Sequence, residues 1–451
     1  MLLQTKEIQI PEEDPFRFDV LHREECAEAL TEFVCSAKDS MVICVDAQWG
    51  QGKTTFFQMW RRHLLNHEIP TIYFNAWKNN FSDDAIVCLI GEMRASLPAL
   101  IEELVQREEA LIQDAFDRVM DTGSVLIPRS FDAAAQLSRQ KSDDENVRGA
   151  SEKIARQEIL QYEHSRRQLL AFREALRQFV VTLSDTEKPT PLIFIIDELE
   201  RCRPDFSIAV LEKLKHVFNA ENIVFVLGMD KEQFGSSMKT VYGEGLNVQG
   251  CFQRFVDFDY ILPTSHKGEF VKVLFTEYGF SEYFASGSVY FQKLGVIALN
   301  IFASLFAVYK LTLREQKNAC RTLSLVIRTT KTKTELHPIF LCFLIVLKTK
   351  VPPDYHDFVN GKTSAIEMLL RFRKDVHGEQ IRAGFCIALE AYIFSARAAS
   401  YAEVLEESRK FFSETNLERM FLEFQRLQRE NGIGSLAELA TKLEVISRFR
   451  G

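Results

Sequence analysis

Short apolar runs alternate with amphipathic stretches over the first 265 residues of the chain. The apolar runs predict strands at 41–47, 71–77, 191–197, 222–230 and 252–263. The amphipathic stretches predict helices at 22–37, 53–65, 82–97 and 206–219. Strands that are apolar throughout are typical of a parallel sheet that is covered on both faces. The alternation therefore predicts an α/β fold, in which a parallel sheet carries helices on both faces.

The segment 99–188 has a different character, because it is dense in charged residues and amphipathic. It predicts a helical insertion that presents a solvated face or a partner surface. Residues 121–150 are polar and broken by Gly and Pro, which predicts a mobile loop, and residues 151–183 predict one long helix. An earlier helix over 101–120 is predicted from apolar residues on one face, namely Leu104, Leu111, Ala115 and Val119.

Beyond residue 265 the pattern is helical to the end of the chain. Residues 294–309 and 338–347 are strongly apolar, but both are shorter than the roughly 20 residues that a membrane span needs. We interpret them as core helices. The chain is predicted to divide into four segments. These are the first half of the sheet domain (1–98), a charged helical insertion (99–188), the second half of the sheet domain (189–265), and an all-helical lid and C-terminal domain (266–451).

Composition narrows the class of protein. A chain of 451 residues is expected to form two or three domains. The net charge of -8 disfavours a global electrostatic grip on nucleic acid. Nine cysteines occur without a CxxC pair, which disfavours a zinc ribbon or a disulfide framework and favours a reducing compartment. With an acidic, polar start in place of a signal peptide, this indicates a cytoplasmic protein.

The turn after the first predicted strand, "DAQWGQGKTT", nearly matches the phosphate-binding pattern G-x-x-x-x-G-K-[ST]. Backbone N–H groups freed by glycine cradle phosphate oxygens there, and the following helix adds its dipole. Lys53 is expected to reach the β- and γ-phosphates, and Thr54 to hold Mg²⁺. Ala47 replaces the first glycine, which costs energy only if its φ is positive. The predicted nucleotide-binding residues are Gly50, Gln51, Gly52, Lys53, Thr54 and Thr55.

A second group of candidates follows the third predicted strand, in "LIFIIDE". Asp197 is predicted to hold Mg²⁺ through water, and Glu198 to act as the general base that activates the attacking water. The alternative interpretation is an Asp-Glu pair that caps the next helix.

Three further polar residues are candidates for sensing the γ-phosphate or for completing the site. Asp230 ends a strand expected beside that of Asp197, and it could instead cap the following helix. Arg201 could reach a neighbouring subunit as an arginine finger or fix its own loop. Arg314, in the helical region, is a candidate second sensor.

The segment 310–350 is locally basic and could contact a nucleic-acid backbone, although a solvated helical face is the more common role of such a pattern. Its basic residues are Lys310, Arg314, Lys317, Arg321, Arg328, Lys331, Lys333, Lys348 and Lys350, against Glu315 and Glu335.

Four stretches in order, "WGQGKTT", "FNAWKNNFSDDAI", "FIIDELERCRPD" and "NIVFVLGMD", together resemble the KAP family of P-loop NTPases. The resemblance covers roughly residues 14–330, apart from the insertion, and extends to "LTLREQKNA". It implies an oligomerising ATPase with a helical lid and an extra strand between the phosphate-loop strand and the acid strand. It also implies a structural role for Trp77 at the end of the sheet.

The chain departs from the family pattern at three points. Ala47 stands where glycine is usual, and Glu198 and Glu200 stand where Asp is usual. Many family members carry transmembrane helices in the insertion, whereas this insertion is charged, which favours a form without a transmembrane segment. The family includes bacterial phage- and plasmid-exclusion proteins, so a defence role is implied by analogy alone.

Three functional hypotheses follow. The first is an ATPase that uses ATP and Mg²⁺ to drive assembly or signalling, as a homo-oligomer with a protein partner. The second is a scaffold or adaptor that holds ATP without turnover. The third is an ATPase stimulated by nucleic acid through the basic segment 310–350.

Overall fold

The computed structural model describes residues 9–79, 84–104, 108–126, 147–184, 190–263, 268–286, 289–330, 337–376, 383–397 and 432–446, with a few positions between 402 and 425. The described chain forms two compact units that divide between Pro263 and Thr264. The first unit contains a sheet, and the described residues of the second form helices and no strand.

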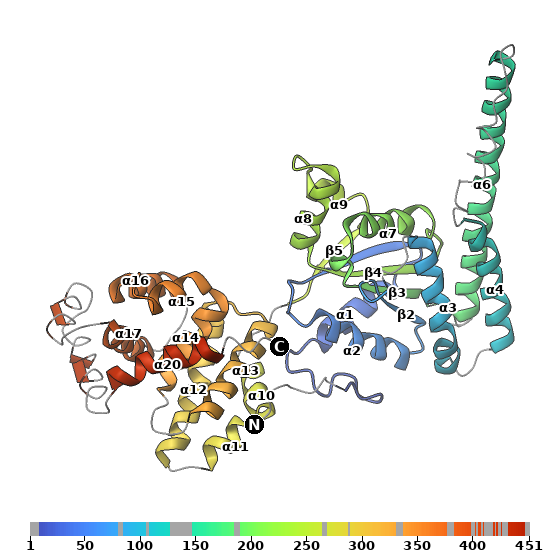
Figure 1. Ribbon diagram of the computed structural model, residues 1–451. Helices are drawn as coiled ribbons and strands as arrows, with labels where there is room; N and C mark the ends of the chain where they lie inside the picture. Colours follow the sequence, from blue (N-terminus) through green and yellow to red (C-terminus); the bar gives the residue numbers. More distant parts are fainter. Residues whose placement is uncertain are drawn as a thin grey trace. The chain divides into compact units, whose positions relative to one another are not determined.

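The first unit is built on five parallel strands in the order β2-β3-β4-β1-β5 (Figure 1). The β4 strand lies between β1, which precedes the glycine-rich turn, and β3, which precedes the acids, as the family resemblance implied. The strands are β1 (Met41–Asp46), β2 (Thr71–Asn75), β3 (Leu192–Asp197), β4 (Ile223–Met229) and β5 (Phe258–Ile261).

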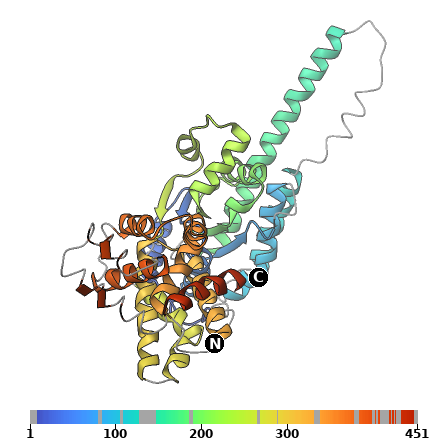
Figure 2. The same ribbon diagram turned by 60° about the vertical axis from the view of Figure 1, so that its left-hand side comes forward.

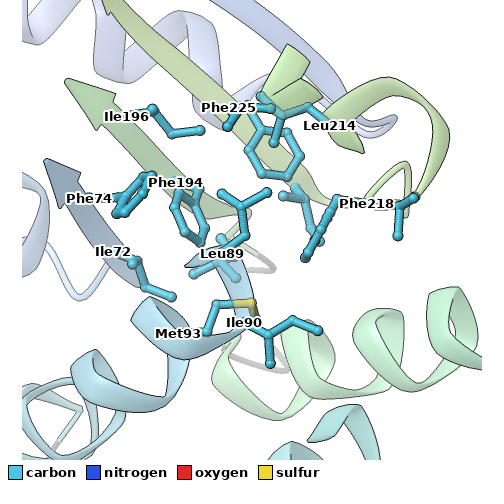
Figure 3. Close-up of a cluster of buried hydrophobic side chains, with 14 of the residues drawn as sticks. Ile72, Phe74, Leu89, Ile90, Met93, Phe194, Ile196, Leu214, Phe218 and Phe225 are labelled. Carbon is cyan, nitrogen blue, oxygen red and sulfur yellow. The ribbon is translucent and has the colours of Figure 1, made fainter. Parts of the chain in front are cut away.

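Helices cover both faces of this sheet, and successive strand residues alternate between two apolar clusters. Ile193 and Ile195 of β3 pack toward α1 and α2, whereas Phe194 and Ile196 pack toward α3 and α7. Figure 3 shows the second cluster, in which Leu89 and other α3 side chains meet the aromatic rings of the strands. The predicted two-sided parallel sheet is therefore confirmed. The covering helices are α1 (Glu24–Cys35), α2 (Lys53–Asn66), α3 (Ala85–Glu103), η1 (Leu199–Arg201), α7 (Pro204–His216), α8 (Lys231–Tyr242) and α9 (Val248–Phe252).

In its described residues the charged insertion contains the helices α4 (Glu109–Leu126) and α6 (Val147–Leu183), and α6 extends well past α4 (Figures 1 and 2). The long predicted helix is confirmed, but two details of the prediction are wrong. No single helix covers 101–120, because α3 ends at Glu103 and α4 begins at Glu109. In addition, Leu111 is 56 % exposed, since Ile112 takes the buried position.

The predicted loop at 121–150 is helical at both of its described ends, because α4 continues to Leu126 and α6 begins at Val147. Residues 127–146, the remainder of that loop, lie outside the described part of the chain.

The second unit packs its helices around one apolar cluster. The two strongly apolar stretches lie in α12 and α14, and both contribute to this cluster, as predicted. Among the described residues no helix meets the length and hydropathy of a membrane span. The helices are α10 (Glu269–Glu277), α11 (Phe280–Ala285), α12 (Val289–Val308), α13 (Leu313–Thr329), α14 (Pro338–Lys350), α15 (Pro352–Val359), α16 (Ala365–Val376), α17 (Ala383–Arg397) and α20 (Gly432–Ile446).

Candidate active site

The glycine-rich turn joins β1 to α2 and has the backbone conformation that a phosphate-binding loop needs. Gly50 has φ 81° and Gly52 has φ 76°, in the left-handed region that side chains disfavour. Gly52 is also the N-cap of α2, so the turn leads directly into a helix N-terminus with unpaired N–H groups. The turn therefore suits an anionic ligand.

Ala47 starts the turn without strain, which explains how the first glycine of the pattern can be absent. Its φ is not positive, and its N–H donates to the carbonyl oxygen of Met229 at 3.2 Å, which continues the pairing of β1 with β4. Because this bond holds Ala47 in line with β1 and its methyl group is buried, a Cβ is accommodated.

Lys53 is buried and is the first residue of α2, directly after the turn. Its ammonium donates to the carbonyl oxygen of Ala47 at 3.1 Å and to Oε1 of Glu200 at 3.3 Å. The first contact brings the ammonium back to the residue that starts the turn. Thr54 follows in the first turn of α2, and Thr55 is the next residue along this helix.

Asp197 ends β3 and is fully buried. Its carboxylate accepts from the Tyr73 hydroxyl at 2.9 Å and from the Glu198 backbone N–H at 2.9 Å, and it is hydrogen-bonded to the Thr54 side chain. Burial raises the pKa of Asp197 to about 6, although the bonds from Thr54 and Tyr73 and the charge of Lys53 oppose that rise. The hydroxyl and carboxylate predicted to hold Mg²⁺ are thus in direct contact.

Glu198 follows in a left-handed conformation, with φ 61°. This conformation is costly for a residue with a side chain, and such strain is most often found at functional sites. One carboxylate oxygen accepts from the Asn75 amide at 3.1 Å, and the other pairs with the Arg201 guanidinium at 2.9 Å. Glu198 does not act as a helix cap through its side chain, so the capping alternative is not supported.

Asp230 performs two tasks at once. One carboxylate oxygen accepts from the backbone N–H of Gln233 and caps α8, while the other accepts from the backbone N–H of Trp49 at 2.9 Å. The sensor and cap interpretations of this residue are therefore compatible, and its second oxygen fixes the turn that carries Gly50.

Arg314 lies in the second unit, on the exposed side of the first turn of α13. Its role as a second sensor stays a prediction. Trp77 does lie just beyond β2, but it is 51 % exposed, so the structural role expected of it is not supported. Gln51 is buried, and its side-chain Oε1 has no hydrogen-bond partner among the described residues.

Sequence reasoning missed four residues that shape the site. Asn75 and Tyr73 lie on β2, whose register with β3 places Asn75 opposite Asp197. The rule that selected Asp197, a polar residue at the carboxyl end of an apolar strand, would also have selected Asn75.

The other two missed residues gave no such signal. Arg23 is buried and donates to the carbonyl oxygens of Gln51 at 2.8 Å, Gly52 at 3.3 Å and Pro263 at 3.2 Å. Desolvation lowers the pKa of Arg23. The sequence showed Glu200 only as a departure from the family pattern.

These residues fit a nucleoside triphosphate with a magnesium ion. The left-handed glycines and Lys53 offer donors to phosphate, and the bonded pair of Thr54 and Asp197 offers the oxygen ligands that magnesium prefers. Glu198 supplies a carboxylate at the same edge of the sheet, where ligands of parallel sheets bind.

The solved structures that this chain resembles include two ORC proteins, both at low identity. The Drosophila ORC bound to DNA is 15% identical, with 94% of this chain and 87% of that chain covered and a TM-score of 0.34. The Aeropyrum pernix ORC2 protein in its ADPNP-ADP complexes is 11% identical, with 95% and 94% covered and a TM-score of 0.32. At these scores the similarity bears on neither the function nor the arrangement of the whole chain. No curated protein matches the sequence.

The KAP family P-loop domain matches residues 23–330, from Arg23 beneath the turn to the end of α13. The match spans more than half of the chain and includes all of the candidate residues above. The chain therefore belongs to the KAP family of P-loop NTPases.

Proposed function

We propose that this protein binds ATP with Mg²⁺ at the carboxyl edge of its sheet and hydrolyses it to drive assembly or signalling with a partner. Membership of a P-loop NTPase family supports nucleotide binding and hydrolysis in general. The observation that carries the specific proposal is the contact of Thr54 with Asp197, one residue before a strained and oriented Glu198.

The turn binds the triphosphate through its backbone N–H groups, and Lys53 donates to the β- and γ-phosphates. Thr54 and Asp197 hold the magnesium ion, which when bound neutralises part of the phosphate charge. Asp197 must be ionised for this role, and with a pKa of about 6 it is ionised at neutral pH.

Glu198 accepts the proton of the water that attacks the γ-phosphorus, while the bond to the oxygen bridging the β- and γ-phosphorus atoms breaks. Asn75 and Arg201 orient its two carboxylate oxygens. Arg201 is thus bonded within its own chain in this structure. To act as an arginine finger in the site of a neighbouring subunit, Arg201 must break its ion pair with Glu198.

The finer parts of the proposal rest on the family. We include a homo-oligomer, a protein partner and a role in phage or plasmid exclusion, which follow from the resemblance to other family members. A cytoplasmic location is supported by nine cysteines that are all free.

The test measures ATP turnover, ATP binding and particle size together for the wild type, Glu198→Gln and Lys53→Ala. Glu198→Gln is expected to lower turnover at least about 100-fold while ATP binding persists, because only the proton acceptor is lost. Lys53→Ala is expected to lose binding. Glu102→Gln, at an exposed position of α3, is the matched control. Unchanged turnover in Glu198→Gln would instead favour the non-hydrolysing scaffold.

One observation supports the nucleic-acid hypothesis, namely a row of basic side chains on α13. Arg314, Lys317, Arg321 and Arg328 recur at helical spacing on its exposed or half-exposed side. The wider basic face predicted over 310–350 is wrong in part, because Lys348 pairs with Glu444 and Lys350 pairs with Glu315. Lys331, Lys333 and Glu335 lie outside the described residues.

Stimulation of turnover by single- or double-stranded DNA that disappears at high salt would support this second function. Lys317→Glu is expected to lose this stimulation while its basal turnover is unchanged. That result would assign nucleic-acid binding to α13.

A further inference from the structure

Glu200 makes contacts that the proposed hydrolysis does not use. Its Oε1 accepts from the Lys53 ammonium at 3.3 Å and from the indole Nε1 of Trp49 at 2.9 Å. Trp49 lies in the glycine-rich turn and Lys53 begins α2 directly after it, whereas Glu200 lies in η1, directly after the acids of β3. One carboxylate oxygen therefore joins the two halves of the site.

This carboxylate depends on Lys53. Glu200 is 5 % exposed, and its second oxygen, Oε2, is buried with no hydrogen-bond partner among the described residues. A buried carboxylate with an unsatisfied oxygen is costly, and the charge of the paired lysine offsets that cost. Lys53 is 7 % exposed and is likewise a buried cation that needs a counter-ion.

Two anions thus require the same cation. The ammonium of Lys53 already donates to Ala47 and Glu200, and nucleotide phosphates require it at the same turn. Phosphate oxygens and the Glu200 carboxylate cannot both be close to Lys53 without mutual repulsion in a buried site.

We propose that Glu200 is an internal counter-ion that competes with nucleotide phosphate for Lys53, so that nucleotide binding displaces this carboxylate. The inference rests on the proposed function, because it assumes that Lys53 binds phosphate. It assigns to Glu200 the role of a positioning residue, which sets the affinity of the site without touching the reacting atoms.

Trp49 reports the displacement. Its backbone N–H is fixed by Asp230, but its indole N–H is bonded to the carboxylate that moves, and the ring is 41 % exposed. Nucleotide binding therefore changes the emission of Trp49, and the change disappears in Trp49→Phe.

The experiment compares ATP-Mg²⁺ binding by calorimetry in the wild type and in Glu200→Gln, which keeps the shape of the side chain and removes its charge. The variant is expected to bind about tenfold more tightly, because nucleotide no longer breaks a charge-assisted bond. The matched control is Glu390→Gln in the helical unit, since Glu390 is also buried and pairs with Arg373 at 2.9 Å. This control is expected to lose stability without gaining affinity.

A second readout is the melting temperature. Without nucleotide, Glu200→Gln is expected to melt lower than the wild type, because Lys53 loses its counter-ion, and the stabilisation on adding ATP-Mg²⁺ is expected to be larger. Glu200→Asp retains the charge one methylene further from Lys53 and is expected to show an intermediate affinity, which keeps the test decisive if the glutamine variant does not fold.

Equal or weaker ATP binding by folded Glu200→Gln would overturn the inference and would assign Glu200 to support of the turn. This outcome differs from failure of the proposed function, in which the wild type and Lys53→Ala bind ATP alike.

Discussion

Replacing Asp197 by Asn is expected to stabilise the protein in the absence of ligand above pH 6 and to abolish its stabilisation by ATP-Mg²⁺. The residue is fully buried, and burial raises its pKa from the usual 3.8 to about 6. Ionised Asp197 is therefore a cost to the folded state, which metal binding offsets.

The magnitude follows from the shift in pKa. A rise of roughly two pKa units corresponds to about 3 kcal/mol at about 1.4 kcal/mol per unit. The shifted pKa already includes the opposing bonds from Tyr73 and Thr54. In Asp197→Asn the side-chain NH₂ faces the Tyr73 hydroxyl, so this hydroxyl must rotate and accept a hydrogen bond where it donated one before. This change reduces the expected gain in the free energy of unfolding to about 1–3 kcal/mol.

The size of this gain depends on pH. A raised pKa means that the folded state holds the proton more tightly than the unfolded state, so this contribution is fully present below about pH 4 and is lost as pH rises through 6. The advantage of Asp197→Asn should therefore grow between pH 4 and 6 and stay constant above. Urea unfolding followed by tryptophan fluorescence measures it, because Trp49, Trp60 and Trp77 all lie in the unit that contains the site.

Asp117→Asn, at an exposed position on α4, is the control and should change the free energy of unfolding by less than about 0.5 kcal/mol. A destabilised Asp197→Asn at pH 8, or a difference from wild type that is the same at pH 4 and pH 8, would refute the reasoning.

Three further predictions concern packing and the support of the site. A Cβ at Gly228, in β4, would lie 2.0 Å from the buried ring of Phe57 and 3.0 Å from Asp197, so Gly228→Ala should destabilise the protein by about 1–3 kcal/mol in urea unfolding. Gly91→Ala adds a Cβ with nothing within 4 Å of it and should stabilise the protein by about 0.5–1 kcal/mol. If the two alanine variants changed the free energy of unfolding equally, the packing argument for Gly228 would be wrong. Arg23→Ala should cost about 3 kcal/mol and weaken ATP binding about tenfold by calorimetry, because the carbonyl oxygens of Gln51 and Gly52 each lose a charged donor. Wild-type affinity in that variant would show that the turn holds its shape without Arg23.

Much of the fold and the centre of the site could be predicted because each depends on local chemistry. Uninterrupted apolar runs can be buried only between two layers of helices, so the two-sided sheet followed from the pattern. Glycines before Lys53 and acids after an apolar strand mark the carboxyl edge of such a sheet, where Asp197 and Thr54 do meet.

The sequence by itself determined which residues could bind phosphate and magnesium, whereas the tertiary structure decided what surrounds them. Arg23 and Glu200 became part of the site only because folding buried their charges beside the turn, 28 and 147 positions away from their partners Gln51 and Lys53. Ala47 was ambiguous until its backbone angle and its pairing with β4 were known. Burial and strand register are properties of the assembled chain, and they set the charge balance around Lys53.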